Sequence, residues 1–279
     1  MGDARLRGDL SAGRSISDAE FKLFQEFFHD LIGLHLADHK KALVSGRLGR
    51  RLTVLGLEDF HGYFRLISSK DEPEELQVAI DLITTNETSF FRERDHFELL
   101  AKVILPSFAR KKSLQVWCGA SSTGEEPYTL AMVMHRHWGA SGWRLIATDI
   151  NSEVLAKARQ GLYPMERAAG IADQDLKAYC LRGTGEFEGK FLIDKPLRSR
   201  IEFRQMNLMQ LDRDLQDLDI VFLRNVLIYF DAPTKERLLT EVGERMRSGA
   251  WLLLGHSESL TGLHLPQFHL SSSSVYRKP

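Results

Sequence analysis

The sequence is poor in several features that would assign a protein to a specialised class. Its 279 residues include only two cysteines, Cys118 and Cys180. They are far apart and match no CxxC or metal-ligand spacing, so two buried thiols in a reducing compartment are the simpler interpretation. No apolar run approaches the roughly 18 residues of a membrane-spanning helix, and the opening residues MGDARLRGDLSAGRS lack the apolar core of a secretion signal. We therefore expect a cytoplasmic protein without direct membrane insertion.

The chain also lacks a large excess of charge of either sign. Its formal net charge is −1, from 37 basic and 38 acidic residues. A partner selected through phosphate charge requires a basic protein, so we expect no nucleic-acid partner. One local exception lies between residues 36 and 66, where six basic residues outnumber three acidic ones. Four of the basic residues lie at near-helical spacing and form a modest basic face: Lys40, Arg47, Arg50 and Arg51.

Helical patterns fill the first third of the chain. Ser17 and Glu20 have the spacing of a capping box, and apolar residues follow at helical intervals from Phe21. Further helices are predicted near 40–55, 59–67 and 74–83, and nothing before residue 83 resembles a strand. The sequence therefore predicts an all-α domain over residues 15–85.

After about residue 112 short apolar runs alternate with helical segments. Strands are predicted at 114–118, 143–150, 219–223 and 250–255, with helices at 125–138, 153–160 and 233–246. This alternation is typical of a parallel sheet with helices on both faces. A final pair, 267–270 and 274–277, predicts an antiparallel edge. The rhythm breaks near 181–206, which we interpret as a small antiparallel insertion.

The first strand-to-helix turn, in WCGASSTGEEPYTL, departs from the pattern of dinucleotide-binding proteins. Gly119 and Gly124 allow backbone to approach a ligand, but GxGxxG is absent. Glu125 and Glu126 follow at the helix N-terminus, where two carboxylates repel a phosphate and suit a ligand that carries an ammonium group. A nicotinamide dehydrogenase is therefore disfavoured.

Polar side chains also follow the other predicted strands. Asp149 lies 30 residues beyond Gly119, where a carboxylate accepts hydrogen bonds from ribose hydroxyls. The alternative is an N-cap, for which Asn151 is better placed. Asn207 and Asn225 follow strands as well, so their amides suit an adenine edge or an amino acid backbone. Loop asparagines are, however, more often turn formers.

The linking segment ITTNETSFFRERDHF is dense in ligand-binding groups. Phe90 and Phe91 are expected to anchor it to a core, so that its polar residues are held in position. Those residues are Thr84, Thr85, Asn86, Glu87, Thr88 and Arg92. The histidine pairs 35/39 and 135/137 lack a third ligand, so no metal site is expected.

Four segments, TTNETSFFRE, CGASSTGEEPYTLA, ATDIN and FLRNVLIYFD, resemble in this order the motifs of the CheR chemotaxis receptor methyltransferases. The resemblance covers nearly the whole chain from about Ser17. It implies an α/β fold: a seven-stranded, mostly parallel methyltransferase sheet with helices on both faces over residues 86–279, a small antiparallel β-subdomain within it, and an N-terminal all-α domain. The implied methyl donor is S-adenosylmethionine and the product S-adenosylhomocysteine.

The resemblance also implies roles for particular residues. The donor-binding set is Asn86, Thr88, Arg92, Glu125, Asp149, Asn207, Leu208, Asn225 and Val226. Arg92 and Tyr229 would lie nearest the transferred methyl. The implied acceptors are glutamates on the methylation helices of chemoreceptors. A glutamate with a reference pKa of about 4.3 is already ionised at neutral pH, so no general base is needed.

The implied partners are the cytoplasmic domains of chemoreceptors, and a monomer is expected. The basic face would dock on acidic receptor helices, although a solvated helix face is the commoner fate of such a run. A receptor C-terminal pentapeptide would add to the edge of the β-subdomain, which we place between Gly185 and Ile193. Two other functions remain open: methylation of another protein or a small molecule, and an adaptor that binds the donor without turnover.

Overall fold

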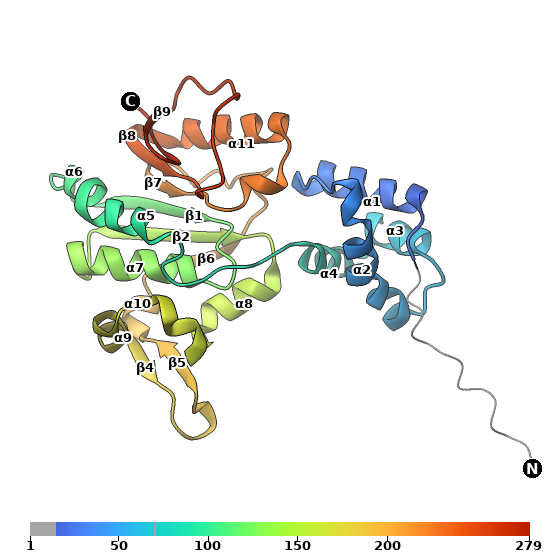
Figure 1. The fold of residues 1–279 in the computed structure, drawn as a ribbon, viewed down its shortest axis with the longest axis horizontal. Helices are drawn as coiled ribbons and strands as arrows, with labels where there is room; N and C mark the ends of the chain where they lie inside the picture. The colour runs from blue at the N-terminus through green and yellow to red at the C-terminus, as the bar shows by residue number, and fades with distance from the viewer. Residues whose placement is uncertain (1–14, 70) are drawn as a thin grey trace, which may run out of the picture. The chain divides into compact units, whose positions relative to one another are not determined.

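The computed structural model describes residues 15–69 and 71–279, which form two compact units divided between Thr84 and Thr85 (Figure 1). The boundary expected from the sequence, between residues 85 and 86, lies one residue further along. Residues 1–14, which make up nearly all of the opening segment without a secretion signal, lie outside the described residues. No helix among the described residues is long and apolar enough to cross a membrane.

The first unit consists of helices, as expected, and its described residues contain no strand. They are α1 (Asp18–Ile32), the 3-10 turn η1 (Asp38–Lys40), α2 (Lys41–Leu55), α3 (Phe60–Ser68) and α4 (Pro73–Ile83). The capping box is confirmed, because the Ser17 side chain accepts from the Glu20 N–H and the Glu20 carboxylate accepts from the Ser17 N–H. The buried face of α1 supplies phenylalanines to the core, where Phe24 meets Phe60 edge to face.

Two residues of the basic face are engaged inside this unit. Arg51 donates to both carboxylate oxygens of Glu75, at 2.9 and 2.5 Å, and the buried Tyr63 hydroxyl donates to the same carboxylate at 2.8 Å. Arg47 Nη1 donates to the carbonyls of Ile83 and Thr84, which end α4. Both arginines therefore hold α2 against α4. Lys40 and Arg50, by contrast, are exposed.

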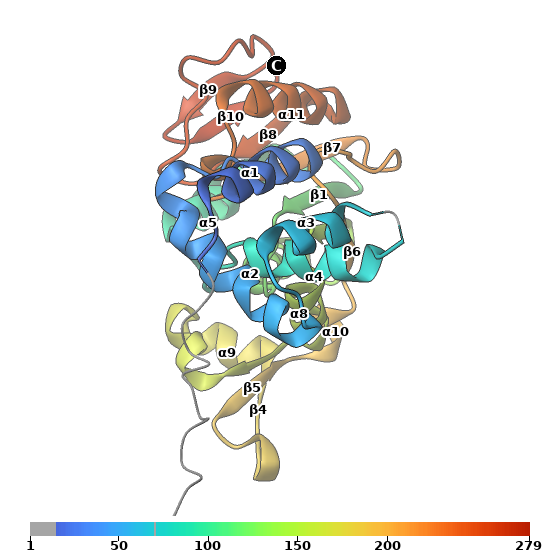
Figure 2. The same cartoon turned by 90° about the vertical axis from the view of Figure 1, so that its right-hand side faces the viewer.

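The second unit is built on a seven-stranded sheet, shown from two directions in Figures 1 and 2. Its strand order is β6-β2-β1-β7-β8-β10-β9, and all pairs are parallel except those of β10. The strands are β1 (Leu114–Gly119), β2 (Trp143–Asp149), β6 (Ile201–Gln205), β7 (Leu218–Phe222), β8 (Met246–Leu253), β9 (His269–Ser272) and β10 (Val275–Arg277). The predicted sheet and its antiparallel edge are confirmed.

Alternation along β1 divides the core into two layers. Leu114, Val116 and Cys118 face one cluster that includes α7 (Glu125–Trp138), whereas Trp117 faces a second cluster that includes α11 (Ala232–Arg245). Successive side chains of a strand point to opposite faces, so this is the pattern of a sheet buried on both sides. The remaining helices and turns are α5 (Arg94–Leu99), the π turn η2 (Leu100–Ile104), α6 (Leu105–Ser107), α8 (Ser152–Gln160), η3 (Met165–Gly170), α9 (Asp173–Tyr179), η4 (Gly185–Phe187), α10 (Lys195–Arg198) and η5 (Leu227–Tyr229).

The β-subdomain differs from its predicted extent. It is a three-stranded antiparallel sheet of order β3-β5-β4, formed by β3 (Leu162–Pro164), β4 (Cys180–Arg182) and β5 (Lys190–Ile193). It therefore begins near residue 162, well before 181. Residues 201–205, assigned to it from the sequence, are strand β6 of the large sheet and pair with β2.

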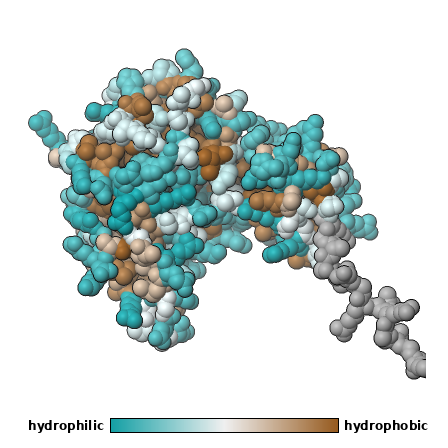
Figure 3. Space-filling view, viewed as in Figure 1, coloured by the Kyte–Doolittle hydropathy of each residue, from teal (hydrophilic) through white to brown (hydrophobic). Residues whose placement is uncertain are grey.

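The prediction of which strand forms the edge of this subdomain is also wrong. The segment between Gly185 and Ile193 contains β5, which is paired on both sides and has no open edge. The open edges belong to β3 and β4. Figure 3 shows apolar surface around α9 and β4, and Leu181 and Phe187 are 52% and 44% exposed. Cys180, which begins β4, is only half-buried, so the expectation of two buried thiols holds for Cys118 alone.

Candidate active site

Four polar or glycine positions lie at one edge of the large sheet. Gly119 ends β1 and Asp149 ends β2, whereas Asn207 and Asn225 follow β6 and β7. These four strands are adjacent and parallel, so their carboxyl ends share an edge. The chain proceeds from β1 to β2 on one side and returns to β7 on the other, which is the topological switch point where open α/β sheets bind ligands.

Asp149 is a buried carboxylate fixed by backbone donors. Its Oδ2 accepts from the Ser122 N–H at 2.8 Å, and its Oδ1 accepts from the Asn151 N–H at 2.9 Å. The cap of α8 is the Asn151 side chain, which accepts from the Val154 N–H. Asp149 is therefore not the cap. These contacts fix the direction of both carboxylate oxygens at the end of β2.

The two glutamates at the start of α7 lie in different environments. The Glu125 carboxyl is buried, accepts from the Thr123 hydroxyl at 2.6 Å and lies 3.3 Å from Arg167. Burial raises the pKa of Glu125 in spite of these contacts. Glu126 instead pairs with Arg224. Gly124, which caps the helix, has φ +96° and leaves no room for a Cβ beside Ala158, so packing alone explains this glycine.

The segment 86–92 is held over the sheet edge through its carbonyls. The Ser122 hydroxyl donates to the Asn86 carbonyl at 2.7 Å, and Arg167 donates to the Thr88 carbonyl at 2.8 Å. Arg92 Nη1 donates to the Glu87 carbonyl at 3.0 Å. Phe90 is buried against Tyr163 and Phe191, as the anchor role requires. Asn86, Thr88 and Arg92 are half-buried, and these hydrogen bonds hold the backbone that carries them.

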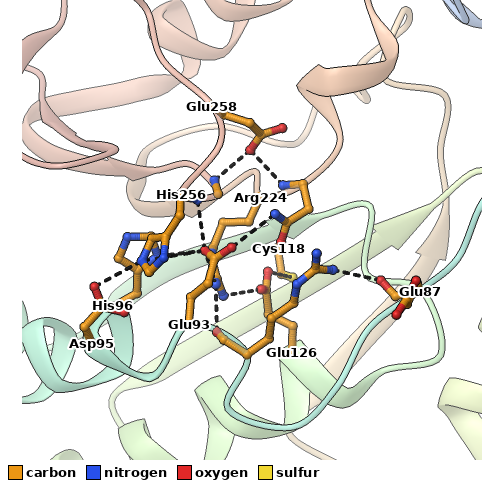
Figure 4. A network of polar contacts seen from close by, with 12 residues as sticks. Glu87, Glu93, Asp95, His96, Cys118, Glu126, Arg224, His256 and Glu258 are labelled. Atoms are coloured by element: carbon orange, nitrogen blue, oxygen red, sulfur yellow. Dashed lines mark hydrogen bonds and ion pairs between the residues drawn. The ribbon is translucent and has the colours of Figure 1, made fainter.

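The fully buried guanidinium of Arg224, directly before Asn225, joins three segments (Figure 4). Its Nη1 donates to Glu126 at 2.6 Å, and its Nη2 donates to Glu93 and to the Arg92 carbonyl, both at 2.7 Å. Burial raises the pKa of Glu93, but the hydrogen bond and charge of Arg224 outweigh that effect and hold the pKa below its usual value. The segment 90–93 (the FFRE turn), the start of α7 and the end of β7 are thereby fixed together.

Asn225 is held in a left-handed conformation, φ 58°, by a second buried acid. Glu258 Oε2 accepts from the N–H groups of Asn225 and Gly255, at 2.7 and 2.6 Å, and its Oε1 accepts from the Ile228 N–H at 3.3 Å. The Asn225 amide donates to Glu93 at 3.2 Å. The loop that carries Asn225, Val226 and Tyr229 is therefore shaped by a carboxylate that also binds the segment after β8.

Backbone strain is concentrated in this region. Seven residues other than glycine have positive φ within 15–69 and 71–279, and five of them border the sheet edge: Phe91, Glu93, Ala120, Ser122 and Asn225. Such conformations cost about 1–3 kcal/mol each for side chains that do not tolerate them, and they cluster at functional sites. This distribution independently marks the same edge.

The remaining expected donor-site residues have structural contacts of their own. The Asn207 side chain accepts from the Met209 N–H at 2.9 Å, which is the turn-forming role that the sequence left open. Leu208, Val226 and Tyr229 pack at the margin of the second core cluster.

Sequence reasoning missed three acidic or basic residues of the site, Glu93, Arg224 and Glu258, and the two histidines His96 and His256. Arg224 had a detectable signal, because it directly follows the buried apolar run 220–223, where an isolated charge needs a buried partner. The others had none, since their partners are distant in sequence.

The fold, and an acidic switch point that disfavours a phosphate ligand, agree with an S-adenosylmethionine-dependent methyltransferase. Residues 86–276 match the SAM binding domain of CheR methyltransferases, and residues 19–84 match the CheR methyltransferase all-alpha domain. The chain belongs to the CheR methyltransferase family, and its cofactor is S-adenosylmethionine.

Named relatives agree with this assignment. The chain is 38% identical to the chemotaxis protein methyltransferase of Escherichia coli K12, covering 99% of this chain and 96% of that one. It is 41% identical to chemotaxis protein methyltransferase 2 of Pseudomonas aeruginosa, covering 86% of each. A SAM-dependent methyltransferase structure from Methanosarcina mazei aligns with a TM-score of 0.32 and 19% identity, over 55% of this chain and 56% of that one, which is too loose to add to the argument.

Proposed function

We propose that the chain transfers methyl groups from S-adenosylmethionine to glutamate carboxylates on the cytoplasmic helices of chemoreceptors, giving glutamyl methyl esters for sensory adaptation. The observation that carries the proposal is the near full-length similarity to chemotaxis protein methyltransferases, combined with the carboxylates and amides at the sheet edge. Such chemistry acts in the cytoplasm, where the receptor helices lie.

The donor site would use the residues described above in distinct ways. Asp149 would accept from both ribose hydroxyls, and Asn207 and Leu208 would border the adenine. Glu125 would meet the cationic amino group, since a buried carboxylate gains most from an incoming positive charge. Asn86, Thr88, Asn225 and Val226 would enclose the rest of the amino acid portion.

The chemical step requires alignment more than acid–base catalysis. A carboxylate acceptor and a sulfonium donor neutralise each other along the reaction path, so the task is to hold the reacting atoms within roughly 3–3.5 Å and exclude water. Strong pairing of Arg92 with the acceptor would stabilise the charged ground state and slow the transfer. Arg92 would therefore mainly position the donor, and Tyr229 would hydrogen-bond one acceptor oxygen and aim the other.

Transfer to glutamate has a direct chemical signature. Incubation with methyl-labelled S-adenosylmethionine and a receptor cytoplasmic fragment should label the fragment, and mild base should release the label as methanol because carboxyl methyl esters hydrolyse readily. A fragment with its candidate glutamates changed to alanine is the control. Donor binding without any labelled fragment would favour the non-catalytic adaptor, and base-stable label would favour another acceptor group.

Substitutions should separate the roles of Arg92 and Tyr229. Tyr229→Phe should lower kcat by roughly tenfold or more, since one positioned hydrogen-bond donor is lost. The affinity for S-adenosylmethionine should not change. Arg92→Ala should weaken both donor binding, measured by calorimetry, and turnover. Tyr179→Phe, a half-buried tyrosine in α9, is the matched control. An Arg92→Ala enzyme with normal affinity and turnover would remove Arg92 from the site.

We further propose that the basic face docks on the receptor through its exposed members, Lys40 at the N-cap of α2 and Arg50 within α2. Reversal of Arg47 or Arg51 would break contacts within the domain, so those two residues cannot test the idea cleanly.

The double change Lys40→Glu with Arg50→Glu should raise the apparent KM for a receptor fragment roughly tenfold, and less at high salt, with donor affinity unchanged. Arg110→Glu with Lys112→Glu, an equal charge reversal next to the amino end of β1, should have little effect. Equal effects of the two pairs would indicate a non-specific dependence on charge.

A receptor C-terminal pentapeptide would add to the β-subdomain at the edge of β4, in place of the strand expected from the sequence. The Gly183 N–H donates to the Lys190 carbonyl, and the Asp194 N–H donates to the Tyr179 carbonyl. In this antiparallel register the backbone N–H and C=O of Leu181 point toward β5, and those of its neighbours in β4 point away from it. The Arg182 N–H therefore faces the open edge, next to the exposed Leu181 and Phe187.

Arg182→Pro removes that outward donor and should weaken binding of a tail pentapeptide about tenfold in calorimetric titration. Arg182→Ala keeps the N–H and should bind nearly as the unchanged protein does. Equal loss in both variants would assign the contact to the arginine side chain and not to strand addition.

A further inference from the structure

A second polar cluster lies beside Arg224, formed by Glu93, Asp95, His96 and His256 (Figure 4). Asp95 and His96 lie in the first turn of α5, Glu93 directly precedes that helix, and His256 follows β8. The two imidazole rings are 4.7 Å apart and nearly perpendicular. One ligand atom from each of Glu93, His96 and His256 lies within 4.8 Å of the other two.

His96 is anomalous for a buried histidine. Its side chain is almost completely buried, at 3% exposure, yet neither ring nitrogen has a hydrogen-bond partner among the described residues. Its Nδ1 lies 3.7 Å from Glu93 Oε2, which is too long for a hydrogen bond. A buried polar group without a hydrogen-bond partner destabilises the folded state, so an imidazole of this kind needs an explanation.

The spacing of the four ligand atoms is close to that of a metal site. His256 Nε2 lies 4.0 Å from Glu93 Oε2 and 3.0 Å from Asp95 Oδ2. Zinc bonds of about 2.0–2.2 Å separate tetrahedral ligands by roughly 3.3–3.5 Å. Small side-chain shifts would therefore bring Glu93, His96 and His256 to bonding distance. Two imidazoles with carboxylates are a donor set that zinc takes in proteins.

The local charge permits a dication. Arg224 lies close by and opposes a metal, because its Nη2 binds the same Glu93 oxygen. Against its single charge stand the carboxylates of Glu93, Asp95 and Glu126, which leave two net negative charges around the cluster. Asp95 and His256 are 69% and 45% exposed at the side chain, so an ion can enter from solvent and retain a water.

We propose that this cluster binds one divalent first-row transition ion of the Zn²⁺ class, through Nδ1 of His96, Nε2 of His256 and the carboxylates of Glu93 and Asp95. The ion gives Nδ1 of His96 a partner and replaces the hydrogen bond between His256 and Asp95, whose proton is released to solvent. It also fixes Glu93, whose backbone continues from Arg92 and whose carboxylate accepts from Asn225. The site thus binds metal next to the methyl-transfer residues without being part of the transfer, and the proposal is independent of the acceptor's identity.

Calorimetric titration of the chelator-treated full chain tests this directly, first with ZnCl₂ and then with CoCl₂. One equivalent of each ion should bind, and bound Co²⁺ should gain visible absorption from its nitrogen ligands. His256→Ala should weaken binding by at least roughly tenfold, and Asp95→Asn should weaken it less. Both side chains are partly exposed, so these variants should retain the circular dichroism of the unchanged protein.

The matched control is His137→Ala, which removes an exposed histidine of α7 far along the chain from the cluster. It should leave the single equivalent intact. The proposal is overturned if the unchanged protein binds neither ion, if His256→Ala binds as tightly as the unchanged protein, or if His137→Ala loses binding equally. None of these readouts requires receptor or S-adenosylmethionine, so they stand apart from the test of methyl transfer.

Discussion

The buried guanidinium of Arg224 sets the geometry on which the rest of the site depends. Its partners Glu126 and Glu93 are 98 and 131 residues distant in sequence, and because its side chain is fully buried it cannot donate to solvent instead. Loss of one partner from a buried ion pair typically costs about 3–5 kcal/mol. The positions of the FFRE turn, the start of α7 and the loop after β7 are therefore energetically coupled, although no local sequence pattern connects them.

Glu258 provides the complementary constraint on the loop after β7. It accepts from backbone N–H groups in the loops after β7 and β8, and these contacts hold Asn225 in a left-handed conformation. Burial raises the pKa of Glu258, so each of those N–H donors also serves to keep the carboxylate satisfied. Strain at Asn225 and burial of an acid are two costs that the same contacts offset. The loop is thus fixed by contacts within the protein, which is the kind of preorganisation that the proposed methyl transfer would use.

The sequence predicted the elements whose signal is local. The capping box at Ser17, the helix 125–138 and the strands near Asp149 depend on spacing within about twenty residues, and each is confirmed. The β-subdomain was misjudged because its central strand, β5, pairs with β3, which lies about thirty residues earlier. Local alternation shows that a strand exists but does not show whether it lies at an edge. Strand β6 was likewise assigned to the wrong sheet.

The basic face shows the same limit for surface chemistry. Arg47 and Arg51 have the spacing of exposed positions, but their partners, the end of α4 and Glu75, come from a helix more than twenty residues away. A long side chain at the margin of a helix face can reach either solvent or a neighbouring helix, and the pattern of charge does not distinguish the two. The sequence therefore identified a basic helix correctly and could not sort its arginines into structural and exposed ones.

The two glutamates at the start of α7 differ in how fully a basic side chain neutralises them. Glu126 neutralises Arg224 and is thereby removed from ligand chemistry. Glu125 remains, buried beside Thr123, with a pKa raised by burial and only partly offset by Arg167. A carboxylate in that state is poorly compensated, so a cation that enters the site is stabilised by it more than by an exposed acid. In the proposed donor site, selectivity for a cationic donor over an anionic nucleotide would then depend on which of two adjacent glutamates the fold leaves without a full counter-charge.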